Sequence, residues 1–381
     1  MKKVAIIGAG ISGLFIANLL KRDPNFQITI YEKNTSILLE EGYGVQLSVN
    51  SVKLLNEIGF DKLQNNEKFT PRKINFYSNK ISNKICEFNV SVSKSEDCKY
   101  TTLKRSTLIN FLKRDLGEWI KTGYNISKID QRNDQIKLSF ENDETKECDY
   151  LIISDGVFSK SKSLISKNRA KPKYNDTLAI RGILTKFPEN IDNKSISLFL
   201  GSNFHQVIYP TNHHGDLNFI AIMKYPLSLD EQNKYSLFNE NSFIKKVLDK
   251  VPSAMKDVSN NLNDIKIFPV FVSDDFYKIE SNQIHLIGDA FFAFPPAFAQ
   301  GASQSIESAY EIFKNIQNNT ENDFFKNRVK KTKMVNFRSK LNQFVFHLSN
   351  PINIFFRNLF LKKLVKNKKF LESYLGKIYN N

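Results

Sequence analysis

Residues 4–14 have the sequence Val-Ala-Ile-Ile-Gly-Ala-Gly-Ile-Ser-Gly-Leu, with glycines at Gly8, Gly10 and Gly13. The apolar run at its start has the length of a buried parallel strand. Apolar residues then recur at helical spacing through Leu20, so we expect a strand, a glycine turn and a helix, the context that the G-x-G-x-x-G pattern requires. In this pattern the first glycine permits a tight turn, the second lets the backbone approach a pyrophosphate, and the third lets the helix pack closely on the strand. The stretch therefore predicts a dinucleotide-binding unit with the helix N-terminus at the pyrophosphate.

An acidic residue stands where such a unit requires one. A second apolar run, residues 28–31, ends at Glu32, nineteen residues after Gly13. A carboxylate at this distance accepts hydrogen bonds from the adenosine ribose. The strand, the glycines, the helix and the acid together indicate a bound dinucleotide, and at this point NAD and FAD are both open.

The composition is that of a globular protein with a sizeable core. The chain has 381 residues, of which 41% are hydrophobic and 25% are charged, and 32 residues are Phe. This length suggests one large domain or two closely joined ones. Met1-Lys2-Lys3 leads directly into an apolar run that is too short for a signal peptide, and no uninterrupted apolar stretch reaches the roughly 18–20 residues of a membrane span. We therefore expect neither a secretion signal nor a transmembrane segment.

The cysteines and the net charge limit the environment and the partners. The 3 cysteines are widely spaced, unlike a disulfide framework or a zinc site, so we expect a reducing compartment, the cytoplasm. His213 and His214 have no carboxylate or cysteine at ligand spacing beside them, and we expect no metal. The net charge of +16 makes nucleic acid and anionic membrane candidate partners, although an AT-rich genome that favours Lys and Asn is a simpler explanation. Because the basic residues form no recognisable nucleic-acid module, we expect no nucleic-acid partner.

The order of the apolar patterns divides the chain into four parts. Residues 1–175 are expected to form the first part of the dinucleotide-binding domain, with a small inserted sheet at about residues 65–100. Residues 176–273 contain successive strands with turns between them, which predicts a substrate domain built mainly on an antiparallel sheet. Residues 274–320 return to the first domain, and residues 321–381 are expected to form C-terminal basic helices.

Two further strand ends carry glycine and aspartate. The apolar run at residues 150–153 ends in Ser154-Asp155-Gly156, and the run at residues 283–287 ends in Gly288-Asp289-Ala290. An aromatic and proline-rich segment follows the second run, and Gln300-Gly301-Ala302-Ser303 then opens a predicted helix. Taken alone, each of these strand ends is also typical of a simple turn.

The ordered set of three motifs, near residues 8, 155 and 288, resembles that of the FAD-dependent aromatic hydroxylase family. These single-component flavoprotein monooxygenases include salicylate, para-hydroxybenzoate and kynurenine hydroxylases and the ubiquinone-pathway hydroxylases. The segments that contain Gly44 and Gln300 are most similar to the salicylate-hydroxylase-like branch. The resemblance covers most of residues 1–316. It implies an α/β fold, in which an FAD-binding Rossmann-like domain is interleaved with an antiparallel-sheet substrate domain and followed by a C-terminal helical region.

The resemblance also implies roles for single residues toward FAD. Glu32 would bind the adenosine ribose, Asp289 the ribityl chain, and Arg105 the region near the pyrophosphate and ribityl chain. Asp155 and Gly156 would shape the region that FAD and the nicotinamide share. The N-terminus of the predicted helix at residue 301 would stabilise negative charge on the reduced flavin. The expected cofactor-binding residues are Gly8, Gly10, Ser12, Gly13, Leu14, Glu32, Lys33, Val45, Arg105, Asp155, Gly156, Gly288, Asp289, Gly301, Ala302 and Ser303.

Two positions depart from the family pattern. Phe292 stands where the family usually has a His after its Gly-Asp motif, a position that concerns packing and substrate contacts beside the flavin. Lys162 stands where the family usually has Arg, so that a point charge replaces a bidentate guanidinium. Neither departure removes the FAD site. No second strand–glycine–helix unit appears, so we expect NADH or NADPH to bind transiently in a groove.

The resemblance implies that NAD(P)H reduces the flavin, that O2 adds at flavin C4a, and that the resulting hydroperoxide hydroxylates a small phenolic molecule. The flavin carries this chemistry, so no acid–base dyad is required. His205 and Tyr209 are candidates to polarise a phenol and Arg181 to pair with a substrate carboxylate, while a purely structural role is the alternative for each. The expected pocket residues are Arg181, Tyr209, Phe292, Phe294 and Pro296, although part of this aromatic wall is alternatively plain core.

Three alternative functions remain. One is a hydroxylase of the ubiquinone-pathway type, which acts on a lipid-soluble quinone precursor at the membrane surface. Another is a flavin-binding redox protein without hydroxylase activity, which the departures at Lys162 and Phe292 favour. The third is a flavin halogenase, but the typical Trp-x-Trp-x-Ile-Pro motif is missing, and Trp119 is the only Trp.

Residues 350–381 bear on the first alternative. From Pro351 onward, apolar residues alternate with 7 Lys and Arg residues against one acid, Glu372. A basic amphipathic helix of this kind can lie in a membrane interface with its lysines on anionic headgroups. The alternative is a C-terminal helix packed on the catalytic domain with a solvated basic face. We therefore expect a cytoplasmic monomer or homodimer, and a peripheral membrane contact stays open.

Overall fold

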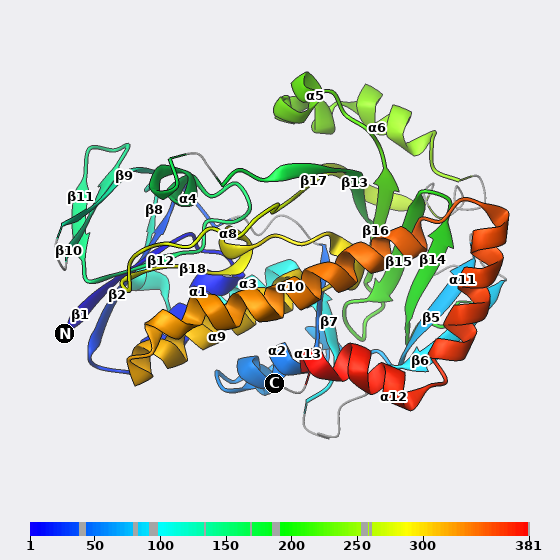
Figure 1. Cartoon of the computed structure of the whole chain (residues 1–381), viewed down its shortest axis with the longest axis horizontal. Helices are drawn as coiled ribbons and strands as arrows, with labels where there is room; N and C mark the ends of the chain where they lie inside the picture. The colour runs from blue at the N-terminus through cyan, green and yellow to red at the C-terminus, as the bar shows by residue number, and fades with distance from the viewer. Residues whose placement is uncertain are drawn as a thin grey trace.

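The computed structural model describes residues 1–37, 43–78, 83–90, 98–132, 135–167, 170–184, 191–252, 258 and 261–379. Two large sheets of different character lie side by side, and a long C-terminal helix extends from the first toward the second (Figure 1). The α/β class with a parallel Rossmann-like sheet, an antiparallel second sheet and C-terminal helices, which the sequence predicts, is confirmed.

The first sheet has five parallel strands in the order β18-β12-β1-β2-β8. Its strands are β1 (Lys2–Ile7), β2 (Phe26–Glu32), β8 (Ile120–Thr122), β12 (Tyr150–Ile153) and β18 (Ile284–Leu286). Helix α1 (Ile11–Leu20) packs on β1 and β2, while α3 (Arg105–Lys113) and α9 (Gly301–Asn318) pack on α1.

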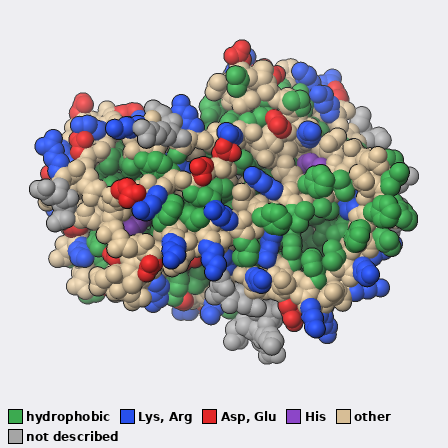
Figure 2. Space-filling model, in the orientation of Figure 1, with side chains coloured by type: hydrophobic (Ala, Val, Ile, Leu, Met, Phe, Trp, Pro, Cys, Tyr) green, Lys and Arg blue, Asp and Glu red, His purple; other side chains and the backbone are tan. Residues whose placement is uncertain are grey.

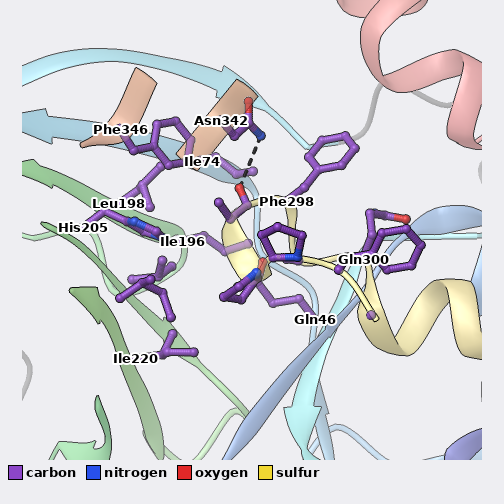
Figure 3. A pocket seen from close by; sticks show the side chains of 18 of the residues that line it. Gln46, Ile74, Ile196, Leu198, His205, Ile220, Phe298, Gln300, Asn342 and Phe346 are labelled. Atoms are coloured by element: carbon purple, nitrogen blue, oxygen red, sulfur yellow. Dashed lines mark hydrogen bonds between the residues drawn. The ribbon is translucent and has the colours of Figure 1, made fainter. Parts of the chain in front are cut away.

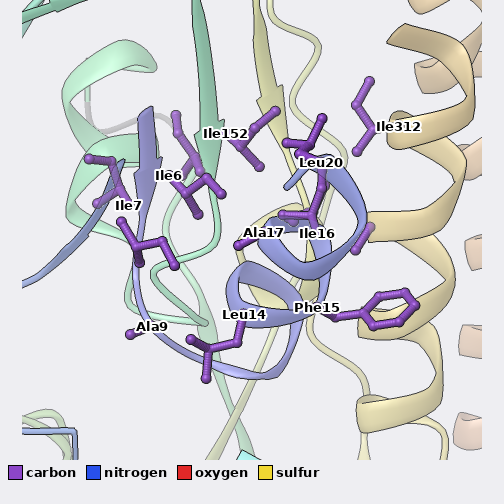
Figure 4. Packing of buried hydrophobic residues seen from close by; sticks show 14 of the residues in the cluster. Ile6, Ile7, Ala9, Leu14, Phe15, Ile16, Ala17, Leu20, Ile152 and Ile312 are labelled. Carbon is purple, nitrogen blue, oxygen red and sulfur yellow. The ribbon is translucent and has the colours of Figure 1, made fainter. Parts of the chain in front are cut away.

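Helix α1 is enclosed on all sides. Every residue of α1 except Ile11 is buried, as expected for a helix that is apolar around its whole circumference. Figure 4 shows Phe15 directed toward α9, where Ile312 also lies, while Ile6 and Ile152 stand on the neighbouring strands. This continuous packing fixes the start of α1, and with it the glycine turn, relative to the sheet.

The second sheet has seven strands in the order β17-β13-β16-β15-β14-β5-β6. Its strands are β5 (Lys73–Ser78), β6 (Lys84–Asn89), β13 (Lys173–Leu184), β14 (Ile196–Gly201), β15 (Phe204–Pro210), β16 (Leu217–Lys224) and β17 (Leu262–Val272). All neighbours pair antiparallel except β14 and β5. Helix α6 (Asn241–Leu248) packs on one face through Phe243 and Val247, and the other face forms the wall of a cavity.

Residues 65–100 do not form the separate inserted sheet that the sequence predicts. Strands β5 and β6 extend the second sheet, with Ile74 opposite Ile196, and the short strand β4 (Lys68–Phe69) joins another sheet. The period-2 pattern identifies these strands, but β14, the second partner of β5, lies far along the chain, where local sequence gives no register. Residues 79–82 and 91–97 of the predicted sheet lie outside the described residues.

A small sheet connects the two large ones. It has the order β3-β7-β4, with β3 (Gly44–Leu47) and β7 (Thr101–Lys104) antiparallel. The Gly44 N–H donates to Asn218 Oδ1 of β16 at 2.5 Å, and a Cβ atom on Gly44 would lie 2.8 Å from the ring of Tyr209. Only a glycine lets β3 pass so close to the second sheet. A third small sheet consists of β9 (Ile126–Arg132), β10 (Gln135–Phe140) and β11 (Thr145–Cys148).

The C-terminal region consists of helices, as the sequence predicts. These are α10 (Glu321–Phe346), α11 (Pro351–Leu364), α12 (Lys368–Leu371) and α13 (Lys377–Tyr379). Asn350 caps α11, because its Oδ1 accepts a hydrogen bond from the Ile352 N–H at 2.9 Å. The remaining short helices are α2 (Val49–Asn56), α4 (Lys160–Ile165), α5 (Leu229–Asn233) and α8 (Gly288–Phe291). None of the helices in the described ranges is both long and apolar enough to cross a bilayer.

Candidate functional site

The glycine turn and the Asp-Gly motif meet at the carboxyl ends of β1 and β12. Gly8 has a φ of +100°, and a Cβ atom there would lie 2.7 Å from the Ser154 carbonyl oxygen. A Cβ atom on Gly13 would lie 2.2 Å from the Gly8 carbonyl oxygen. The Ser154 hydroxyl lies 2.8 Å from Ile7 O and 3.0 Å from Gly8 O, within hydrogen-bonding distance of both. The turn therefore packs tightly against Ser154 on one side and against the first turn of α1 on the other, as the three-glycine pattern requires.

Among the three glycines of the turn, Gly10 is the one with free space beside its Cα atom. A Cβ atom on Gly10 would have a single neighbour within 4 Å, the Ser154 carbonyl oxygen at 4.0 Å, and Gly10 has an ordinary φ of −85°. The protein itself therefore does not demand glycine at this position. A ligand that must approach the backbone closely would demand it.

Glu32 is fixed at the end of β2, beside the glycine turn. Its Oε2 accepts a hydrogen bond from the Ala9 N–H at 3.0 Å, and its Oε1 accepts one from the Asn34 N–H at 3.0 Å. The side chain stays partly exposed, so its remaining lone pairs face outward. Lys33 is exposed next to it, whereas Leu14 is fully buried in the core and offers only its backbone.

The third motif packs against the start of α1. Gly288 has a φ of +59°, and a Cβ atom there would lie 2.6 Å from Ser12 Oγ. The next residue, Asp289, is directed into the cavity. The protein atoms around its carboxyl group raise its pKa to about 6, and the positive charge of Arg105 opposes this rise. Arg105 therefore lies close enough to Asp289 to act on its charge, although the two residues are far apart in sequence.

The N-terminus of α9 opens into the same cavity. Gly301 and Ala302 line it, and a Cβ atom on Gly301 would have no neighbour within 4 Å. The unpaired N–H groups of this helix end carry a partial positive charge. Ser303 instead faces inward, because its Oγ accepts a hydrogen bond from the Ser48 N–H at 3.1 Å and fastens α9 to the residue before α2.

Asp155 has one buried carboxylate oxygen without a protein partner. Its Oδ2 accepts a hydrogen bond from the Ser161 N–H at 3.0 Å, but its Oδ1 has no hydrogen bond within the described residues. Burial raises the pKa of Asp155, while the neighbouring Ser159 hydroxyl and the Ser161 N–H oppose the rise. Burial lowers the pKa of Lys162, and the charge of Asp155 opposes this. An orphaned acceptor beside the glycine turn fits a ligand with hydroxyl groups.

The cavity has a volume of about 530 Å³ and lies between the second sheet, the segment at residues 293–302 and the C-terminal helices. Alternate residues of three neighbouring strands point into it, because successive side chains of a strand face opposite sides. This wall includes Ile196 and Leu198 of β14, Val207 of β15, and Ile220 and Ile222 of β16. Figure 3 shows Ile196, Leu198 and Ile220 on one side, and Gln46, Phe298 and Gln300 on the other. The cavity is therefore mainly apolar.

A few polar side chains interrupt this apolar wall near Gly44. Tyr209 is 2% exposed, and burial raises its pKa, opposed by the charge of Arg181 and a hydrogen bond with Gln46. Gln46 Oε1 also accepts a hydrogen bond from the Tyr100 hydroxyl at 2.7 Å. The Arg181 guanidinium lies 5.5 Å from the centre of the Tyr43 ring. Tyr209 thus stays protonated as a hydrogen-bond donor at neutral pH.

His205 lines another part of the cavity and is paired with a second histidine. Its Nδ1 lies 2.8 Å from Nε2 of His347, the C-cap residue of α10. Burial lowers the pKa of His205 well below the usual value and that of His347 to about 4. The pair is therefore neutral at physiological pH. The sequence gives no signal for His347, because the contact depends on how the C-terminal helices fold back over the second sheet.

The structure brings most of the predicted pocket residues together. Arg181, Tyr209, Phe294 and Pro296 line the cavity, as do His205 and Val45. Phe292 does not, since it is 2% exposed and stacks on Phe276 in the core with ring centres 4.6 Å apart. The C-terminal helices supply a wall that the sequence does not predict as pocket, formed by Leu341, Asn342, Val345, Phe346, Leu361 and Tyr374. Within the described residues no group of three His, Cys, Asp or Glu side chains is arranged for a metal.

Comparisons with known proteins agree with this geometry. The family model described as "FAD binding domain" matches residues 1–322. The 3-amino-4-hydroxybenzoate 2-monooxygenase PtnB3 of Streptomyces platensis is 23% identical over 328 residues, which cover 81% of this chain and 78% of that protein. Salicylate hydroxylase of Pseudomonas putida is 21% identical over 341 residues, which cover 81% and 75%.

Solved structures share the whole fold. Klebsiella pneumoniae HpxO complexed with FAD and uric acid superposes with a TM-score of 0.83 at 14% identity, covering 98% of this chain and 97% of that one. A salicylate hydroxylase substrate complex superposes with a TM-score of 0.79 at 18% identity, covering 100% and 95%. The orphaned Asp155 oxygen, the space beside Gly10 and the open end of α9 all fit the FAD that the family model names.

Proposed function

The chain belongs to the FAD binding domain family and is an FAD-dependent monooxygenase, and we propose that it hydroxylates an apolar phenolic molecule in the cavity, with NAD(P)H and O2 as co-substrates. One observation carries this proposal. The N-terminus of α9, at Gly301 and Ala302, opens into the same cavity as the apolar face of the second sheet. A cofactor ring placed at this helix end would have the substrate directly beside it.

The residues that would hold FAD come from all three motifs. Glu32 would accept hydrogen bonds from the ribose, and Asp155 Oδ1 and Asp289 would accept them from other hydroxyl groups. The space beside Gly10 would admit the pyrophosphate, and Arg105 would neutralise part of its charge. When bound, FAD supplies the transfer of two electrons from NAD(P)H to O2, of which one oxygen atom enters the substrate and the other leaves as water.

The protein's part is to stabilise charge and to exclude water. The N–H groups at Gly301 and Ala302 would stabilise negative charge on the reduced cofactor ring, as a helix N-terminus does. The apolar strand residues of the second sheet keep the reacting atoms away from water, which protects the oxygen-transfer step from side reactions. Neither role requires a titrating side chain.

The polar group near Gly44 would orient the substrate. Tyr209 is a protonated donor in an otherwise apolar wall, and Arg181 places a positive charge near it. A substrate that binds as a phenolate would accept a hydrogen bond from Tyr209, and Arg181 would stabilise its negative charge, which activates the ring toward oxygen transfer. His205 would contact a second polar group at another part of the wall.

A lipid-soluble quinone precursor is a second candidate within the same reaction type. It is favoured by the mainly apolar walls, which include side chains of the C-terminal helices such as Leu361 and Val345. A small carboxylated aromatic would have a single cationic partner in the wall, because Arg181 is the sole Lys or Arg among the cavity-lining residues that the structure describes.

The test is a screen of purified protein with phenols and quinone precursors for stimulated NADH or NADPH oxidation. The proposal expects at least one apolar phenol to raise oxidation above the background, with a product that has gained one oxygen atom. If the protein holds FAD but no compound gives an oxygenated product, the alternative of a redox protein without hydroxylase activity is supported instead.

A further inference from the structure

The exposed apolar side chains are concentrated on two C-terminal helices. Of the thirteen large hydrophobic residues that are exposed in the described part of the chain, eight lie on α10 and α11. On α11 these are Ile352, Phe355, Phe356, Leu359 and Phe360, which are between 49% and 65% exposed. Their spacing places them on one side of the helix. Monomeric proteins rarely leave such a cluster in contact with water without a function.

Helix α10 continues this surface. Phe337, Leu341 and Phe344 follow one another at helical spacing in its C-terminal half, and all three are exposed. We call these three residues and the five of α11 the apolar face. Figure 2 shows hydrophobic side chains gathered over these two helices, around a hollow in the surface.

The apolar face adjoins the cavity. Leu341 belongs to both, since it is exposed and also lines the cavity. The opposite side of α11 contributes Leu361 and Leu364 to the cavity wall. Helix α11 therefore separates the cavity from the outside with apolar side chains on both of its sides. This differs from a helix packed on the domain with a solvated basic face, because the outward side of α11 is largely aromatic.

Lysines surround the apolar face. Between Phe324 and Asn381 the sequence has 14 Lys and Arg residues and a single acid, Glu372, although Arg328, Lys331, Arg338 and Arg357 are buried. Lys340, Lys362 and Lys363 are exposed, and no carboxylate of the described chain lies within ion-pair distance of them. An aromatic surface with a lysine rim is complementary to an anionic lipid surface, which takes up the rings at the headgroup level and pairs with the ammonium groups.

We propose that the apolar face docks on an anionic lipid surface and that the substrate passes from the lipid into the cavity beside Leu341. The entry of substrate rests on the proposed function, whereas the docking does not depend on any activity. A second copy of this chain is a weaker occupant, because pairing two apolar faces would bring their lysine rims together and the like charges would repel.

The experiment is co-sedimentation of the full-length, FAD-loaded protein with lipid vesicles. One set of vesicles is phosphatidylcholine alone, and in the other about a third of the lipid is phosphatidylglycerol. Two test proteins are made. The Phe variants carry Phe355→Ser, Phe356→Ser and Phe360→Ser together, and the Lys variants carry Lys362→Glu and Lys363→Glu together. The matched control is Leu229→Ser, which removes an exposed apolar side chain from α5, outside the apolar face. The flavin absorbance of each variant reports that the fold is intact.

The proposal expects the parent protein and Leu229→Ser to bind the anionic vesicles at low salt and to dissociate as salt rises. The Phe variants should lose about tenfold in vesicle affinity, and the Lys variants should lose the preference for anionic lipid. Parent protein that stays in the supernatant, or Phe variants that bind as well as the parent, would overturn the docking. A parent dimer that the Phe variants convert to monomer, seen by light scattering, would assign the face to a second copy. If docking holds but no phenol is hydroxylated, the proposed function fails alone.

Discussion

The carboxylate of Glu32 accepts a hydrogen bond from the backbone N–H of Ala9 at 3.0 Å. This contact joins the end of β2 to the glycine turn, and it sets the acid beside the space that Gly10 leaves open. Because the Asn34 N–H occupies the other oxygen, the side chain has one fixed orientation. A cofactor ribose would meet an acceptor that is already positioned and loses little entropy on binding.

Glu32→Ala should therefore weaken FAD binding about tenfold to a hundredfold, since a lost charge-assisted hydrogen bond costs about 1.5–3 kcal/mol. FAD titration of the apoprotein, followed by flavin fluorescence, measures the change. Glu147→Ala is the matched control, because Glu147 is exposed on β11 and has no role in this account. Equal affinity in the two variants would show that the ribose lies elsewhere.

Substitutions at Gly10 and Gly13 should affect FAD binding and protein stability differently. Gly10→Ala adds a methyl group in free space, so its free energy of unfolding should stay within about 1 kcal/mol of the parent, while FAD retention falls at least about tenfold. Gly13→Ala places a Cβ atom against the Gly8 carbonyl oxygen and should cost about 2–3 kcal/mol of stability in the absence of FAD. Urea unfolding and flavin absorbance measure both effects. A Gly10→Ala protein that keeps its FAD would refute the placement of the pyrophosphate.

The histidine pair predicts a pH dependence of stability. The pKa of His347 is lowered by burial from 6.5 to about 4, so the folded protein keeps it neutral where the unfolded chain takes up a proton. The contribution of neutral His347 to the free energy of unfolding is fully present above pH 6.5 and is lost as the pH falls toward about 4. His347→Gln removes the titrating ring while its amide can still hydrogen-bond His205, so the free energy of unfolding at pH 7 should fall by no more than about 1 kcal/mol. The variant should also lose less stability than the parent between these pH values.

Urea unfolding across this pH range checks the histidine prediction. His214→Gln serves as the control, because His214 is exposed and lies outside the histidine pair. A His347→Gln protein whose stability falls as steeply as that of the parent would rule out the neutral pair as the source of the slope.

Tyr209 should matter for turnover and not for the cofactor. Tyr209→Phe removes the buried hydroxyl and keeps the ring, so FAD content should stay unchanged while kcat/KM for a phenolic substrate falls about tenfold to a hundredfold. Tyr235→Phe, at a residue that is 58% exposed, is the control. Stopped-flow absorbance separates flavin reduction from later steps. An unchanged kcat/KM would show that Tyr209 has only a structural role in the cavity wall.

The local parts of the cofactor site could be predicted from the sequence. Gly8, Glu32 and Asp289 each lie at or shortly after the end of a strand, and the carboxyl ends of parallel strands meet at one edge of a sheet. The motifs therefore predict their own proximity. Their roles toward FAD remain predictions until the variants above are measured.

The cavity walls could not be predicted in the same way. Phe292 and Phe294 have the same local pattern, yet Phe292 packs on Phe276 in the core and Phe294 lines the cavity. Phe346 and the inward side of α11 reach the cavity because α10 extends beyond the first sheet before the chain turns back. Which face of an apolar helix meets a cavity depends on tertiary packing, which periodicity does not specify.

The central claim is that this chain transfers one oxygen atom from O2 to an apolar phenol, and isotope-labelled O2 tests it most directly. Holoenzyme, NAD(P)H and a phenol that stimulates oxidation are incubated under O2 labelled with heavy oxygen, and the product mass is measured. The account predicts a product that contains a single labelled oxygen atom and no label when only the water is labelled. Consumption of NAD(P)H and labelled O2 with hydrogen peroxide as the sole product, for every phenol that stimulates oxidation, would contradict it.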